Sequence, residues 1–120
     1  MGTALEVTAA MNPLIEHHLE TIRALAREYG VARLDVFGSV CTPDFDPQTS
    51  DIDILVTFPA NYDFGPWHAR FHALQRAISE VLGQPVDLVD AWALRNRWFA
   101  REVAKTRHTI YDASDVAQIA

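Results

Sequence analysis

Aspartates set among apolar residues are the side chains of this sequence best suited to chemistry. Asp51 and Asp53 flank one isoleucine in D-I-D-I-L-V, and Asp87 lies in V-D-L-V. On a strand, the first two carboxylates point to the same face, about 6.5–7 Å apart along the chain. Carboxylates this close raise each other's pKa and cost stability, a cost that a divalent cation removes. Their hard oxygens suit Mg²⁺ or Mn²⁺, so the pair predicts a metal site.

A third carboxylate completes this site if its strand lies beside the first. Asp87 is the preferred candidate, and Asp90 is the alternative, on the opposite pleat at the strand end. An isolated D-x-D pair is more often a solvated strand end. The apolar run Ile-Leu-Val-Thr-Phe after Asp53 favours a buried strand that carries its acids at one end.

Gly38-Ser39 directly follows a short strand candidate. Glycine permits a tight turn and a close approach of the backbone to a phosphate, and serine adds a hydroxyl donor. The amides that follow can surround an anion. The dipeptide alone is a weak signal, but before the acidic strand it predicts a bound nucleotide.

The elements that must position these residues follow from the spacing of apolar side chains and from Gly and Pro punctuation. The last predicted helix, over 91–107, is expected to turn four apolar side chains toward the core: Leu94, Trp98, Phe99 and Val103. The order αββαβα predicts an α/β fold, with a small mixed sheet flanked by helices. The expected elements are a helix over 12–29, strands over 34–37, 51–58 and 85–90, helices over 67–82 and 91–107, a loop over 39–50 with a helical turn near its start, a turn at 61–65 and a short edge element at 110–111.

Length and charge limit the function. The 120 residues fit one domain, expected over 12–120 after a flexible leader over 1–11. The net charge of −6 argues against duplex DNA as a partner, and no apolar run is long enough to span a membrane. The single cysteine, Cys41, excludes an internal disulfide and favours the cytoplasm. Five of the ten Lys and Arg residues lie in the tail after residue 90, where Arg97 and Arg101 are the candidates to contact a triphosphate.

Three motifs occur in order: V-F-G-S (36–39), D-I-D-I-L-V (51–56) and V-D-L-V (86–89). Together they resemble the nucleotidyltransferase signature of the DNA polymerase β superfamily, and most closely the minimal nucleotidyltransferases (MNT), which are often encoded beside a HEPN-domain toxin. The resemblance spans residues 12 to 112. The loop between Ser39 and Asp51 is one residue longer than is usual, and the Arg-Gly that commonly follows Gly-Ser is V-C-T-P-D here.

The resemblance implies roles for these residues. Ser39 and the amide after Gly38 would hold the terminal phosphates of a nucleoside triphosphate, most simply ATP. Asp51 and Asp53 would bind two Mg²⁺ ions, and Asp87 would bind the ion nearer the acceptor and help to deprotonate its hydroxyl. The implied reaction moves AMP to a hydroxyl of a partner, here a HEPN-type toxin.

Two other functions stay open. The chain can be an antitoxin whose nucleotide site is idle and which inhibits its partner by complex formation; the missing arginine favours this. Transfer to a small molecule is the third, and less favoured because the chain lacks the helical domain with which larger relatives bind an acceptor. Either a second chain, in a homo- or hetero-oligomer, or the substrate itself is therefore expected to complete the site.

Overall fold

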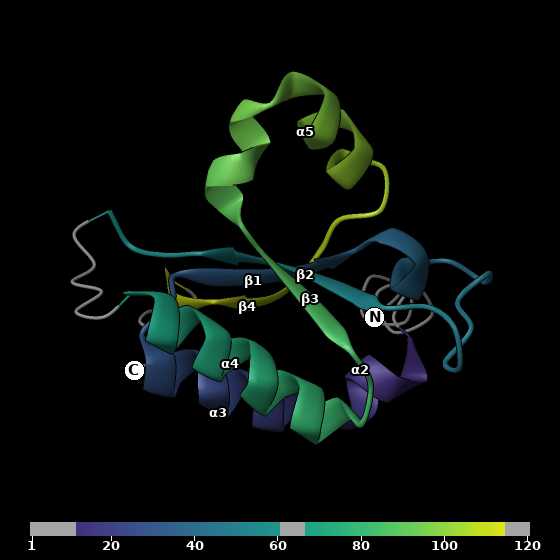
Figure 1. The fold of residues 1–120 in the computed structure, drawn as a ribbon, viewed down its shortest axis with the longest axis horizontal. Coiled ribbons are helices and arrows are strands. Elements are labelled where there is room, and N and C mark those ends of the chain that lie inside the picture. The colour runs from purple at the N-terminus through teal and green to yellow at the C-terminus, as the bar shows by residue number, and fades with distance from the viewer. Residues whose placement is uncertain (1–11, 61–66, 115–120) are drawn as a thin grey trace.

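A mixed sheet of four strands lies between two helical layers (Figure 1). This computed structural model describes residues 12–60 and 67–114. The leader expected over 1–11 and the turn expected at 61–65 lie outside these residues. The predicted α/β architecture is confirmed.

The sheet has the order β3-β2-β1-β4. β1 (Arg33–Phe37) is antiparallel to both β2 (Ile52–Thr57) and β4 (His108–Asp112), and β2 is parallel to β3 (Val86–Asp90). The three predicted strands agree with these bounds to within one residue at each end. The short element expected at 110–111 is a full strand, because it pairs along β1 with a register shift between Leu34 and Asp35.

One face of the sheet is covered by α2 (Pro13–His17), α3 (Leu19–Tyr29) and α4 (Trp67–Leu82), as Figure 1 shows. The predicted bounds of α4 are confirmed. The prediction of one continuous helix over 12–29 is wrong, because the structure has two helices there. The backbone leaves helical geometry at His18 (φ −104°, ψ 11°), whose N–H bonds to the carbonyl of Ile15 at 3.2 Å and closes α2. Apolar side chains on both sides of this break still face the core, since Ile15, Ile22 and Ala26 are all fully buried.

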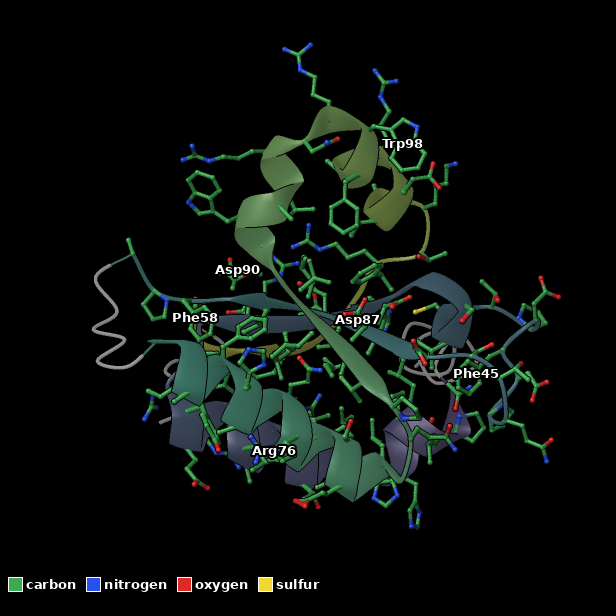
Figure 2. All side chains as sticks on the ribbon, in the orientation of Figure 1. Phe45, Phe58, Arg76, Asp87, Asp90 and Trp98 are labelled. Carbon is green, nitrogen blue, oxygen red and sulfur yellow. The ribbon has the colours of Figure 1, made fainter. Side chains whose placement is uncertain are left out.

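The other face is covered by η2 (Ala91–Arg95) and α5 (Arg97–Ala104). The single helix expected over 91–107 is therefore also wrong. Asn96 is extended and accepts a hydrogen bond from the N–H of Phe99 at 3.1 Å, so it starts a new helix. The new helical phase turns Phe99 and Val103 toward the sheet and leaves Trp98 70% exposed. Figure 2 shows Trp98 on the outer side of α5, which corrects the prediction that it faces inward.

The central strand β2 is buried on both faces. Ile52, Ile54 and Val56 pack into the cluster beneath α3 and α4, while Leu55 packs with Phe37 and Val103 under α5. This alternation leaves Asp53 on the α5 face of the sheet. Within the described ranges, no helix combines the length and the apolar character that crossing a bilayer requires.

Candidate active site

The turn after β1 brings the backbone against a carboxylate. β1 ends at Phe37, which pairs with Asp53 of β2, and the chain then enters the 3₁₀ helix η1 (Gly38–Cys41). Gly38 has φ +78°, and a Cβ at this position would collide with Oδ2 of Asp53. Glycine is required here for two reasons: the left-handed backbone and the contact with Asp53.

The predicted carboxylates meet on neighbouring strands. Asp53 on β2 lies directly opposite Asp87 on β3, at the parallel-strand spacing of about 4.8 Å. Asp51 immediately precedes β2 and is exposed, as is Asp87, whereas Asp53 is half-buried. Asp90, the alternative third acid, lies at the far end of β3, where its carboxylate accepts the N–H of Trp92 at 2.9 Å and begins η2. Figure 2 shows that Asp87 and Asp90 lie apart along β3.

This crowding of negative charge changes the titration of the site. Burial, then the charges of Asp87 and Asp51, raise the pKa of Asp53 from 3.8 to about 6. Burial and the charge of Asp53 likewise raise the pKa of the Cys41 thiol from 9.0 to about 11. The thiol therefore stays protonated at neutral pH, while the carboxylates repel one another.

The donors fit a divalent cation that is shared with a substrate. Among residues 12–60 and 67–114, no three carboxylate, thiolate or imidazole side chains are grouped closely enough to enclose an ion. Mg²⁺ is usually held by one or two carboxylates, with phosphate oxygens and waters filling its other positions. Asp53 with Asp87 or Asp51 supplies such an open set of hard oxygens, and a cation would relieve their repulsion.

Ser39, which follows Gly38, is held in place through hydrogen bonds to its backbone carbonyl. The Ser39 carbonyl accepts hydrogen bonds from both the N–H (2.9 Å) and the hydroxyl (2.8 Å) of Thr42. The Ser39 hydroxyl makes no hydrogen bond with the part of the chain that the structure describes, so it can contact a ligand. The Gly38 N–H, in contrast, is taken by the Thr106 hydroxyl at 2.7 Å.

The two arginines predicted to contact phosphate lie elsewhere. Arg97 and Arg101 are exposed on α5. No hydrogen bond or ion pair of the described residues joins either of them to Gly38, Ser39 or the aspartates. Their contact with a triphosphate stays a prediction.

Comparison with known proteins identifies the family. The model of the nucleotidyltransferase domain family matches residues 19–113. This chain belongs to that family. It is 32% identical over 81 residues, 68% of its length and 78% of the other protein, to the "putative protein adenylyltransferase" of Methanocaldococcus jannaschii. The predicted resemblance to nucleotidyltransferases is confirmed.

Solved structures share the fold. A "putative minimal nucleotidyltransferase" superposes with a TM-score of 0.65 at 26% identity, over 82% of this chain and 94% of that one. A chain from the complex of tri-AMPylated Shewanella oneidensis HEPN toxin with MNT antitoxin gives a TM-score of 0.56 at 21% identity, over 87% of this chain and 77% of that one.

The nucleotidyltransferase also contains a buried polar cluster that the sequence did not reveal. Asp35 of β1 is fully buried and accepts hydrogen bonds from Arg33 Nε (3.2 Å), Arg107 Nη2 (3.1 Å) and the Thr109 hydroxyl. An acid between the apolar residues of L-D-V-F was a signal for such a cluster. Its partner Arg107 could not be predicted from the local sequence, because it follows 72 residues later.

Proposed function

We propose that this nucleotidyltransferase transfers AMP from ATP to a hydroxyl group of a partner protein, with two Mg²⁺ ions, or Mn²⁺, as cofactors. The observation that carries the proposal is the register of the sheet. It sets Asp53 opposite Asp87, with the Gly38 backbone against the Asp53 carboxylate. A site for metal-bound phosphate thus lies on the α5 face of the sheet, at the end of β1.

Each side chain then has a task in the transfer. The Ser39 hydroxyl and the amide after Gly38 would hold the terminal phosphates, and Asp51, Asp53 and Asp87 would hold the metal ions. Bound metal would neutralise charge on the entering and leaving oxygens of an in-line displacement. Asp87 is exposed, so an acceptor hydroxyl can reach it and give up its proton. The acceptor oxygen bonds to the α-phosphorus, the bond to the bridging oxygen breaks, and pyrophosphate leaves.

The partner that fits this proposal is a HEPN-type toxin. A solved relative of this fold is a complex of an MNT antitoxin with a tri-AMPylated HEPN toxin, which supports both the nucleotide and the acceptor. Asp51 and Asp87 are exposed, so the acceptor protein can complete the site. We place the reaction in the cytoplasm, and we keep Arg97 and Arg101 as the proposed triphosphate contacts.

Labelled ATP tests the proposal directly. The chain is incubated with Mg²⁺, a HEPN-type protein and ATP labelled at the α-phosphate or, separately, at the γ-phosphate. Label on the partner from α-labelled ATP alone shows AMP transfer. Asp53→Asn should abolish it, while Asp44→Asn, the same change at an exposed loop position, should leave it intact.

Two results would contradict the proposal. Label that persists in Asp53→Asn excludes the assigned site. A tight complex that forms without label, equally in wild type and Asp53→Asn, supports the idle antitoxin instead.

A further inference from the structure

The glycine of the active-site turn is bonded to a residue from the other end of the chain. The Gly38 N–H donates to the Thr106 hydroxyl at 2.7 Å, across 68 residues of sequence. Thr106 lies in the turn that closes α5, where its own N–H and that of Arg107 bond to the Val103 carbonyl at 3.1 and 2.8 Å. The end of α5 therefore contacts the active-site turn through one side chain.

This bond involves the first of the two peptide groups that meet at Gly38. The Gly38 N–H belongs to the peptide that joins it to Phe37, and the next peptide carries the N–H of Ser39. Gly38 has φ +78° and lies against Asp53, so it is confined on one side by a carboxylate. With the Thr106 hydroxyl on its N–H, the turn is fixed from both sides.

Thr106 is itself held firmly. Val103, which is 1% exposed, packs with Phe37 and Leu55 on the α5 face of the sheet. The next residue, Arg107, donates to the fully buried Asp35 at 3.1 Å. Burial of Asp35 makes this ion pair costly to break, because the carboxylate has no access to water.

We propose that Thr106 is a positioning residue, whose hydroxyl sets the Gly38-Ser39 turn for the triphosphate while the Asp35–Arg107 ion pair holds Thr106 in place. The identity of the ligand rests on the proposed function. The bond between Thr106 and Gly38 does not, and it can be tested without nucleotide.

The test compares Thr106→Val, which removes the hydroxyl and keeps the shape, with Thr106→Ser, which keeps the hydroxyl. Thr21→Val is the matched control, because it makes the same change at an exposed position of α3, away from both the turn and Asp35. Hydrogen exchange of the Gly38 amide is measured by NMR without metal or nucleotide; the chain has only five glycines to assign. Thr106→Val should speed this exchange about tenfold, as expected for loss of one hydrogen bond, and the other two variants should not.

Affinity for a non-hydrolysable ATP analogue with Mg²⁺ gives the second measurement. Thr106→Val should weaken it about five- to tenfold, and Thr106→Ser should restore it. Unchanged Gly38 exchange in Thr106→Val, or faster exchange with unchanged affinity, overturns the proposal. Thr106→Ala replaces the valine variant if that one does not fold. Should wild type bind no analogue, the proposed function fails, while the exchange measurement still decides whether Thr106 holds the turn.

Discussion

Replacing Gly38 with alanine tests how closely the turn must approach the carboxylate. Gly38 and Gly83 both have positive φ, +78° and +65°. A Cβ on Gly83 would meet nothing within 4 Å, whereas one on Gly38 would collide with Oδ2 of Asp53 and lie 3.4 Å from its Cγ. Gly83→Ala is therefore a control that carries the backbone strain without the collision.

The expected loss of folding stability is the sum of the backbone strain and the cost of the collision with Asp53. A left-handed backbone costs an alanine about 1–2 kcal/mol, so Gly83→Ala should destabilise by that amount. Forcing a methyl group against Asp53 adds about 1 kcal/mol, the low end for overpacking, because this half-buried side chain can rotate; Gly38→Ala should therefore lose about 2–3 kcal/mol in total. The Asp53 side chain must also rotate away from the turn. A displacement of about 1 Å in a catalytic group can cost about 100-fold in rate.

Urea denaturation measures the first quantity, and transfer of α-labelled AMP measures the second. Gly83→Ala should lose stability but keep its transfer rate under conditions where it is folded. Gly38→Ala should lose more stability and at least about 100-fold in rate. Equal loss of stability in the two variants, or equal transfer rates, would refute the contact between Gly38 and Asp53 as the reason for glycine.

Three further perturbations probe other parts of the molecule. Asp53→Asn should stabilise the metal-free protein at pH 7.5 by about 0.5–1 kcal/mol, a small value because water screens this half-exposed group. The pKa of Asp53 rises from 3.8 to about 6 on folding, so stability of the wild type falls as pH rises through this window, and the gain should vanish below pH 4 in urea titrations. Asp35→Ala should cost about 1–3 kcal/mol by leaving Arg107 without this partner, less than for a fully buried charge because Arg107 is 29% exposed; a double-mutant cycle with Arg107→Met, which should recover part of the loss, checks this. Trp98→Ala should change the free energy of unfolding by less than about 0.5 kcal/mol, since the side chain is exposed, whereas Phe99→Ala should cost about 2 kcal/mol; equal losses in thermal melts would contradict the orientation of α5.

Local patterns were enough to predict most of the elements. The alternation of apolar and acidic residues in D-I-D-I-L-V identified β2, because a strand with a buried face leaves that period in the sequence. The meeting of Asp53 with Asp87 also followed, once two strands with similar patterns were placed side by side. These inferences needed only neighbouring residues or a single strand pairing.

The errors occurred where caps or distant partners decide the structure. Asn96 carried a readable signal, because asparagine is a preferred N-cap; reading it would have split the last helix and turned Trp98 outward. His18 has no such signal. The contact of Gly38 with Asp53 depends on the register of β1 against β2, and the bond to Thr106 depends on how α5 packs on the sheet. Neither can therefore be inferred from the local sequence.

The pairing of β1 with β4 has a consequence for how this protein folds. Asp35 meets Thr109 across 74 residues, and Gly38 meets Thr106 across 68. Loops this long close late, since their entropy must be lost before the contact forms. If Thr106 positions the Gly38-Ser39 turn as proposed, the turn is set only when the segment after α5 has docked. A chain still being synthesised, with β4 not yet released from the ribosome, would have its acids but not a fixed turn, so catalytic competence should arise at the final step of folding.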